Sequence, residues 1–379
     1  MREATVRNPT RPRVVIAGLG DSGLLTAIHL TRHCDVVGIS NKPGLVSGKE
    51  LGTRLTRPEY WVQDYWISFD RYRRLDSART VHGTVTGVDL DERNVQVTDA
   101  DGASTDEPYD VLVISTGVTS GFWRPRGLLT PDDVAADLEK QHRRLADAAS
   151  IAVIGGGASA VGSAVNLAVT WPEKQVDLYF PGERALTHHH PNVWKTLRGR
   201  VADLGVGLHS GHRAAVPDGF AADRITDDPI EWSTGQDPVS ADAVLWTIGK
   251  VRPNTDWLPE ALLDDDGFVA VEPSLRVPGH PGVFAIGDVA ATDPVRNSAR
   301  NRADRLLARN IRAELAGKPL SDYRPRRGRW GSVVGVQANG LEVFAPGGQM
   351  FRFPAWSIRR ILNGLIVRRG IYRGVRDAA

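Results

Sequence analysis

Apolar and polar positions in the first forty residues predict a strand, a glycine-rich turn, a helix and a second strand. Residues 13–17 form a short apolar run that leads into the turn at residues 18–23. Residues 24–32 then place apolar side chains at helical spacing, and residues 35–39 are again apolar. Elements in this order predict a βαβ unit near the start of the chain.

The same order of patterns returns in the middle of the chain. Residues 150–154 are apolar and enter a second glycine-rich turn, residues 161–170 have helical spacing, and residues 175–180 predict the following strand. The repeat is therefore one of architecture, without the short period of a solenoid.

Other segments predict the elements that connect and follow these two units. The aromatic-rich residues 61–72 predict a helix packed on the core, and residues 297–315 have helical spacing. Asn339-Gly340 lies between two apolar runs and predicts a hairpin with a type I′ turn. Further predicted strands lie at residues 84–89, 94–97, 109–114, 243–248 and 282–286.

The first turn fits the pattern G-x-G-x-x-G through Gly18, Gly20 and Gly23. In this pattern the first glycine permits a tight turn, the second lets a pyrophosphate approach the backbone, and the third allows close helix packing. A glycine-rich turn without a ligand is the alternative. The acid expected at the end of the second strand, where it would hold a ribose, is replaced by Ser40, and Lys42 could reach a phosphate.

The second turn has the variant pattern G-x-G-x-x-A, with Gly155, Gly157 and Ala160. Its following strand ends at Phe180, again without an acid. Cys34 is the single cysteine of the 379 residues, so the chain holds no redox-active dithiol. Two dinucleotide sites without a dithiol suggest a flavin paired with a nicotinamide cofactor.

Three further motifs carry a resemblance to a known family. Thr247-Ile-Gly249, the strand-end pair Gly287-Asp288 and the Ser115-Thr116-Gly117 turn resemble the signature of FAD-dependent pyridine nucleotide oxidoreductases. Within that family, residues 171–178, the C-terminal hairpin and the missing dithiol resemble the ferroptosis-suppressor branch of the apoptosis-inducing-factor-like enzymes. Type II NADH dehydrogenases are more distant relatives. The resemblance covers about residues 13–345.

The resemblance implies an α/β fold with two Rossmann-like dinucleotide-binding domains, which is the glutathione-reductase-like two-dinucleotide flavoprotein fold. A small C-terminal α+β domain would complete it. The predicted division is a flexible arm (1–10), the FAD-binding domain in two parts (11–118 and 252–325), the NAD(P)-binding domain (119–251) and the C-terminal domain (326–379).

The resemblance also implies the residues that bind the cofactors. FAD would lie on Gly18, Gly20, Ser22 and Gly23, with Asp288 on its ribityl hydroxyls; a helix N-cap is the alternative role of Asp288. Arg54 matches an arginine near the phosphates, and Val85 matches a position at the adenine. The remaining predicted cofactor-binding residues are Ser40, Lys42, Thr116, Gly117, Gly155, Gly157, Ala158, Ser159, Gly249 and Gly287.

Two features limit the predicted chemistry. The family's glutamate near the flavin is Gly162 here, which puts efficient nicotinamide oxidation in doubt. His188, His189 and His190 are adjacent and have no cluster of acidic or cysteine ligands beside them, so we predict no metal site. We nominate no catalytic residue, because the cofactors supply the hydride chemistry and the protein positions them.

The resemblance therefore predicts an FAD-dependent NAD(P)H oxidoreductase that passes electrons to an acceptor, with a quinone as the expected one. A ferredoxin or rubredoxin reductase, whose basic C-terminus would dock an acidic protein, is the first alternative. A flavin-bound sensor with little turnover is the second. No nucleic-acid partner is expected, and a homodimer is kept as an expectation.

Composition and charge bear on where the protein works. No apolar run approaches the ~18 residues that span a bilayer, and the lone cysteine suits a reducing compartment, so we expect a cytoplasmic protein. Residues 296–379 carry 18 basic and 5 acidic residues, which favours either an anionic partner or docking on the acidic body. Ile358, Ile361, Leu362 and Leu365 would form one apolar helical stripe. A basic, amphipathic C-terminus predicts peripheral contact with the inner face of a membrane.

Overall fold

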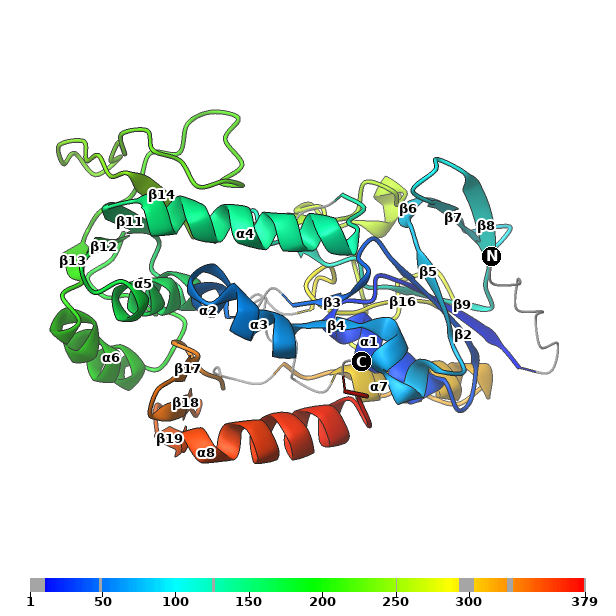
Figure 1. Cartoon of the computed structure of the whole chain (residues 1–379). Coiled ribbons are helices and arrows are strands. Elements are labelled where there is room, and N and C mark those ends of the chain that lie inside the picture. The colour runs from blue at the N-terminus through cyan, green and yellow to red at the C-terminus, as the bar shows by residue number, and fades with distance from the viewer. Residues whose placement is uncertain are drawn as a thin grey trace.

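A computed structural model describes residues 11–47, 50–124, 127–249, 251–292, 303–325 and 330–377. Two α/β lobes lie side by side, and the C-terminal segment runs beneath them as a separate layer (Figure 1). The predicted flexible arm, residues 1–10, lies outside the described residues.

The first lobe is built on a five-stranded parallel sheet with the order β16-β9-β1-β2-β5. Its core strands are apolar and buried on both faces, as expected of a parallel sheet covered on two sides. Helices α1 and α7 pack on one face, and a three-stranded antiparallel sheet covers the other. The bounds are β1 (Arg13–Ala17), α1 (Asp21–Leu30), β2 (Asp35–Ser40), β5 (Arg79–His82), β6 (Thr84–Asp89), β7 (Asn94–Thr98), β8 (Ser104–Pro108), β9 (Val111–Ile114), β16 (Val283–Ala285) and α7 (Ala303–Leu315).

The second lobe is a four-stranded parallel sheet with the order β13-β12-β11-β14. Both predicted βαβ units are therefore present, and each parallel sheet carries one of them. A capping box between Thr130 and Asp133 starts the long helix α4 that covers the second lobe. The bounds are α4 (Pro131–Asp147), β11 (Ser150–Ile154), α5 (Ala158–Thr170), β12 (Gln175–Phe180), α6 (Pro191–Asp203), β13 (Gly207–Ser210) and β14 (Ala243–Trp246).

The aromatic-rich segment is a helix only in its first half. Helix α3 (Pro58–Tyr65) buries Trp61 completely and ends at Trp66. The chain then continues as β4 (Trp66–Ser68), which pairs antiparallel with β3 (Gly44–Val46). The prediction of one helix over residues 61–72 is wrong there, because pairing with β3 outweighs the local helical pattern. The predicted helix over 297–315 is α7 from Ala303 onward, and residues 297–302 lie outside the described part.

The C-terminal hairpin is present, but its predicted type I′ turn is not. Strands β17 (Val336–Gln337), β18 (Gly340–Phe344) and β19 (Met350–Phe353) form an antiparallel sheet. Ala338 and Asn339 occupy the turn, and neither has the positive φ that type I′ requires. Gly340 instead opens the strand β18, where a Cβ would overlap the Phe353 carbonyl oxygen.

The last helix, η4 (Ile358–Ile371), is a π-helix that follows the short α8 (Ala355–Ser357). In a π-helix residues five apart are bonded, so the side-chain period is longer than in an α-helix. The side chains that pack on the body are Ile358, Leu362, Val367 and Ile371, spaced by four and five residues. Ile361 and Leu365 are exposed. The predicted stripe of spacing three and four is therefore split between two faces.

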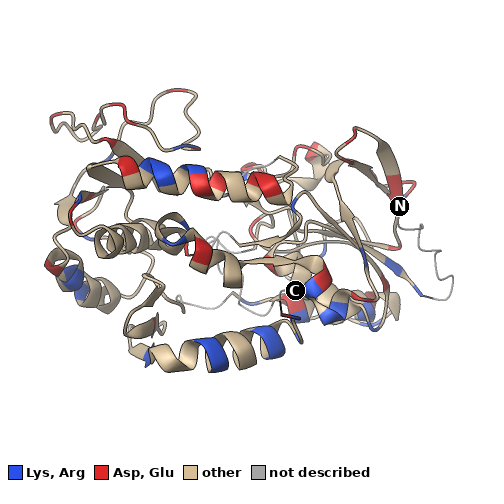
Figure 2. Ribbon diagram, in the orientation of Figure 1, with Lys and Arg blue, Asp and Glu red and all other residues tan. Residues whose placement is uncertain are grey.

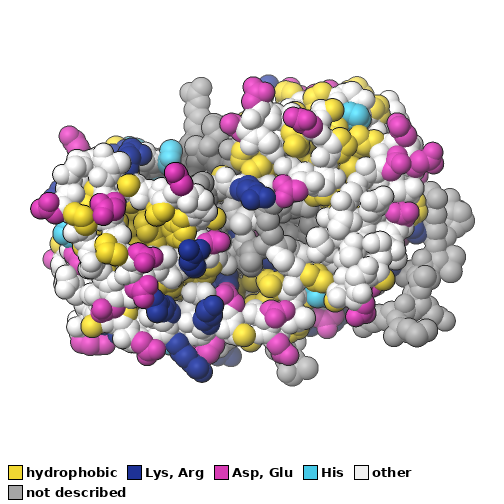
Figure 3. Space-filling view, turned by 90° about the horizontal axis from the view of Figure 1, so that it is seen from above, with side chains coloured by type: hydrophobic (Ala, Val, Ile, Leu, Met, Phe, Trp, Pro, Cys, Tyr) yellow, Lys and Arg dark blue, Asp and Glu magenta, His cyan; other side chains and the backbone are white. Residues whose placement is uncertain are grey.

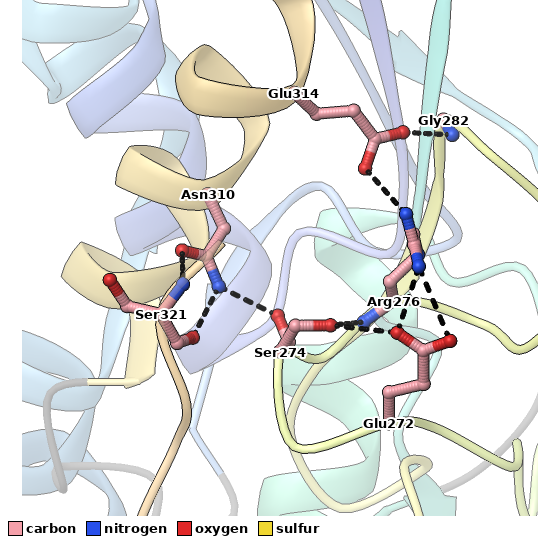
Figure 4. Close-up of polar contacts among 7 residues, drawn as sticks. All are labelled: Glu272, Ser274, Arg276, Gly282, Asn310, Glu314 and Ser321. Carbon is pink, nitrogen blue, oxygen red and sulfur yellow. Dashed lines mark hydrogen bonds and ion pairs between the residues drawn. The ribbon is translucent and has the colours of Figure 1, made fainter. Parts of the chain in front are cut away.

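A polar network anchors α7 to the loop before β16 (Figure 4). Glu314 accepts a hydrogen bond from the Gly282 backbone N–H and lies 3.8 Å from Arg276. Asn310 donates to the carbonyl oxygens of Ser274 and Ser321, both at 2.8 Å. These contacts fix the start of β16, and so they fix the place where Gly287 and Asp288 emerge.

Glu342 binds the C-terminal sheet to the second lobe. Its side chain is only 2% exposed and accepts bonds from Arg200 on α6 at 2.7 and 2.8 Å and from Arg352 on β19 at 2.8 Å. A buried carboxylate between two arginines is costly to break, because removing the charge leaves the partners unpaired.

Replacing Glu342 with Gln should lower the free energy of unfolding by about 3 kcal/mol at pH 7. The hydrogen bonds from Arg200 hold the pKa of Glu342 below its usual 4.5. The stabilisation is therefore complete above pH 4.5 and is lost as the pH falls through the lowered value. Urea unfolding at pH 7 and at pH 3 should show the difference between the two proteins shrinking with acid. Glu139→Gln, in an exposed pair with Arg143, is the control and should cost less than about 0.5 kcal/mol. Equal effects of the two variants would contradict this reading.

Candidate functional site

The first glycine turn joins β1 to α1 and opens outward at one position. A Cβ on Gly18, whose φ is +104°, would overlap the Ser115 carbonyl oxygen, and one on Gly23 would overlap the Gly18 carbonyl oxygen. A Cβ on Gly20 would meet nothing within 4 Å. Gly18 and Gly23 therefore serve internal packing, whereas Gly20 leaves space at the N-terminus of a helix, where a phosphate is stabilised.

The end of β16 lies against this turn. A Cβ on Gly287, with φ +85°, would lie 3.1 Å from the Ser22 hydroxyl oxygen. The next residue, Asp288, receives a 2.8 Å bond from Arg124. Residues 289–292 are not helical, so the alternative role of Asp288 as a helix N-cap is not observed. The predicted residues Ser22, Gly287 and Asp288 thus share one site with the glycine turn.

The end of β2 brings in two further predicted residues. The Ser40 hydroxyl accepts the Lys42 backbone N–H at 3.1 Å, and the Ser40 carbonyl accepts the Gly83 N–H at 2.9 Å. That second bond places the start of β6, which carries half-buried Val85, beside Ser40. Ser40, Lys42 and Val85 therefore lie on the side where the ribose and adenine are predicted.

Positive charges gather next to the first turn. Burial and then the nearby charges of Arg124 and Arg54 lower the pKa of Lys42 to about 8, while Asp21 opposes the shift. Neighbouring positive charges lower one another's pKa, and a bound polyanion would favour their charged forms again. The residues present therefore fit the diphosphate of FAD. Sequence reasoning missed Arg124, which belongs to none of the motifs.

Arg54 is close to this cluster, but its guanidinium already has partners. It donates to Asp137 at 2.9 Å and to the Trp123 carbonyl at 3.2 Å, and it lies 5.0 Å from the centre of the Trp61 ring. Its residue is only 4% exposed. Arg54 thus adds positive charge near the phosphates and ties α2 (Leu51–Thr56) to α4; direct phosphate contact remains a prediction.

The predicted residues Thr116 and Gly117 connect the two lobes. The Thr116 hydroxyl donates to the Asn254 carbonyl at 2.8 Å, and the Asn254 amide returns a 3.0 Å bond to the Thr116 carbonyl. The short strands β10 (Val118–Thr119) and β15 (Arg252–Pro253) pair beside them. Among the described residues, the chain passes from the first lobe to the second at β10 and returns at β15. Gly249 lies shortly before β15.

The second turn repeats the geometry of the first. A Cβ on Gly155, with φ +141°, would overlap the Thr247 carbonyl oxygen, whereas one on Gly157 would meet nothing within 4 Å. Ala160 is fully buried at the third position. Helix α5 begins at Ala158, so the N–H groups of Ala158 and Ser159 belong to its first turn, where phosphates bind.

Gly162, where the resemblance implies a glutamate near the flavin, is tightly packed. A Cβ at Gly162 would overlap the Val333 carbonyl oxygen, because the C-terminal segment packs directly on α5. Gly52 on α2 approaches from the other side, and a Cβ there would lie 2.5 Å from the Gly162 carbonyl oxygen. Any side chain at Gly162 would separate these three segments.

The three adjacent histidines do not converge. The His190 ring accepts the Asn192 N–H at 3.3 Å and caps α6. No group of three or more His, Cys, Asp or Glu side chains suited to a metal ion occurs within the described ranges.

Residues 12–306 match the pyridine nucleotide-disulphide oxidoreductase family, and the chain belongs to this family. It is accordingly an FAD-dependent oxidoreductase that uses NAD(P)H, as the two turns predicted.

Three curated relatives extend this comparison. The chain is 27% identical to oxidoreductase ptaL of Pestalotiopsis fici, covering 77% of this chain and 76% of that one. It is 24% identical to ferroptosis suppressor protein 1 of Xenopus tropicalis, covering 83% of each. It is also 24% identical to the type II NADH:quinone oxidoreductase Ndh of Mycobacterium tuberculosis, covering 86% and 77%.

Solved structures share the fold. A ferredoxin reductase from Rhodopseudomonas palustris superposes with a TM-score of 0.64 at 20% identity, over 90% of this chain and 88% of that one. The two-dinucleotide flavoprotein fold is therefore confirmed.

Replacing Gly20 with Val should abolish FAD binding while the protein stays folded, since a Cβ at this position lies in open space and the side chain would fill the space of the pyrophosphate. Flavin absorbance after purification and circular dichroism measure the two properties. Gly23→Val is the matched control and should impair folding, because its Cβ overlaps the backbone. A Gly20→Val protein that binds FAD normally would contradict the assignment.

Proposed function

We propose that this enzyme passes electrons from NAD(P)H through FAD to a membrane-soluble quinone. Two glycine turns, each with one open glycine at a helix N-terminus, carry the proposal. Bound FAD would accept hydride from the nicotinamide and release electrons to the acceptor. Gly20, Lys42, Arg124 and Asp288 would hold the flavin nucleotide, and Gly157 would admit the nicotinamide nucleotide.

The acceptor has to be a molecule other than a disulfide of this chain. Cys34 is 1% exposed, and burial raises the pKa of its thiol to about 11, so it remains an inert thiol at neutral pH. A buried, protonated thiol cannot relay electrons by thiol–disulfide exchange. This chain therefore has no thiol that could relay electrons between bound FAD and the acceptor.

The C-terminal segment presents a surface that supports a lipid-soluble acceptor. Within the described ranges nine large hydrophobic side chains are exposed, and seven of them follow residue 329. We call these seven the C-terminal apolar surface: Trp330, Met350, Phe351, Trp356, Ile361, Leu365 and Ile366. Trp356 is 74% exposed, which is unfavourable in water and favourable at a lipid headgroup layer.

Basic residues accompany this surface. Figure 2 shows blue and no red along η4. Arg359, Arg360, Arg369 and Arg373 are exposed, and none forms an ion pair within the described part of the chain. By contrast, Figure 3 shows acidic and basic side chains interspersed on the upper face. Apolar side chains beside unpaired arginines suit an anionic membrane.

We infer that the protein docks on the inner face of a membrane in a reducing compartment, where it would meet its quinone. Within the described ranges no helix combines the length and the apolar character needed to cross a bilayer. Contact would therefore be peripheral. The Mycobacterium tuberculosis relative is by name an NADH:quinone oxidoreductase, which agrees with a quinone acceptor here.

A ferredoxin-type reductase is the second candidate, since the unpaired arginines could equally dock an acidic protein.

Under anaerobic conditions NADPH or NADH should bleach the flavin, and a soluble short-chain quinone should restore its colour. Gly157→Val should keep FAD but lose the bleaching, because its side chain would occupy the space of the nicotinamide nucleotide's phosphates. Oxidation by a ferredoxin, with none by the quinone, would favour the second candidate.

The intact protein should co-sediment with anionic phosphatidylglycerol vesicles at low salt and be released at high salt. Replacing Trp356, Leu365 and Ile366 with Ser should abolish co-sedimentation, while Val169→Ser/Leu315→Ser, which alters exposed apolar residues elsewhere, should not. Sedimentation velocity tests whether a second copy of the chain covers the C-terminal apolar surface instead. Dimers that dissociate in the triple variant would assign the surface to a homodimer instead.

A further inference from the structure

The carboxyl end of β12 offers no carboxylate to a ribose. In a Rossmann unit an acid at this strand end binds the adenosine 2′-hydroxyl of NAD, and a nearby arginine accommodates the 2′-phosphate of NADP. Phe180 occupies the strand end, is 2% exposed, and packs edge-on against Trp194 with 5.6 Å between ring centres. The preceding acid, Asp177, is already paired with His209 at 2.7 Å.

The loop after β12 lies directly on the second glycine turn. The Leu186 N–H donates to the Gly156 carbonyl at 2.6 Å, and a Cβ on Gly156 would lie 3.3 Å from the Phe180 Cβ. A nucleotide bound on Gly155 and Gly157 must therefore place its adenosine ribose beside this loop.

Arg184 belongs to this loop and keeps its charge unneutralised. Its terminal nitrogens donate to the Leu186 and Thr187 carbonyls, both at 3.3 Å. Across the parts of the chain that the structure describes, no carboxylate lies within ion-pair distance of it. The adjacent Glu183 is exposed to water. A guanidinium held only by long bonds to neutral carbonyls has donors left for an anion.

The end of β13 is bonded through its backbone to the same loop. The His212 N–H donates to the Phe180 carbonyl at 3.0 Å, and the Gly211 N–H donates to the Gly182 carbonyl at 3.2 Å. His212 and exposed Arg213 thus follow a strand end that is bonded to the loop carrying Arg184. Arg213 thus follows the strand end next to β12, whereas the His212 ring packs against Tyr179 and Trp232.

We propose that the enzyme prefers NADPH to NADH, and that Arg184 and Arg213 bind the 2′-phosphate at the carboxyl end of β12. This inference rests on the proposed function of the second turn as the nicotinamide nucleotide site. A phosphate dianion gains charge-assisted hydrogen bonds there, whereas the strand end itself offers the free hydroxyl of NADH no carboxylate acceptor.

Anaerobic stopped-flow reduction of the FAD-loaded protein tests the preference. We expect NADPH to reduce the flavin at least about tenfold more efficiently than NADH, the ratio expected from one charge-assisted hydrogen bond. Arg184→Ala and Arg213→Ala should each lower the efficiency with NADPH and leave that with NADH within about twofold. Arg184→Lys should retain part of the preference, and Arg198→Ala, at an exposed position on α6, should change the efficiency with neither nucleotide.

Calorimetric binding of 2′,5′-ADP and 5′-ADP to the same holoprotein gives a readout independent of turnover. The first should bind more tightly, and Arg184→Ala should remove the difference. The proposal would be overturned if NADH reduced the flavin as efficiently as NADPH or more so. It would also be overturned if both arginine variants lost equal efficiency with the two nucleotides. Either result would still show that the enzyme oxidises a nicotinamide nucleotide. Failure of both coenzymes to reduce the flavin would instead overturn the proposed function.

Discussion

Backbone contact at the two glycine turns is the constraint on which the rest of the molecule depends. At Gly18 and Gly155 the chain passes so close to a neighbouring strand-end carbonyl, that of Ser115 or Thr247, that a Cβ would overlap it. This contact aims the following helix N-terminus at the open side of the sheet. A Cβ on the neighbouring Gly20 or Gly157 would meet no atom within 4 Å, so the open positions at which we propose that phosphate binds follow from the backbone packing next to them.

Close backbone contact also holds α2, α5 and the C-terminal segment together. Gly52, Gly162 and the Val333 carbonyl stack so closely that no side chain fits between them. Asn166 reinforces the contact by donating to the Val334 carbonyl at 2.9 Å. Because α2, α5 and the C-terminal segment meet here, the packing leaves no space at Gly162 for the glutamate that the resemblance implies.

Patterns local in sequence predicted the two βαβ units and their turns, since strand, glycine and helix signals lie within thirty residues. The residues that depend on tertiary contacts were harder to predict. Trp66 leaves a helical pattern because β3 pairs with it, Gly340 serves a neighbouring strand instead of the turn, and Arg124 reaches Asp288 across 164 positions. The assignment of individual residues to FAD or NAD(P)H, and the domain bounds, stay predictions.

The arginines of the basic C-terminal segment fall into two groups, those with an acidic partner and those without one among the described residues. Arg352, Arg368 and Arg376 bind Glu342, Asp64 and Asp76, so part of the basic segment does dock on acidic groups of the protein. The π-helical period turns Ile358 and Leu362 toward the body and leaves Ile361 and Leu365 outside. Arg359, Arg360, Arg369 and Arg373 are exposed and form no ion pair among the described residues. The two sequence-based interpretations, docking on acidic groups of the protein and an external anionic partner, are therefore compatible, because different arginines of the segment are available for each.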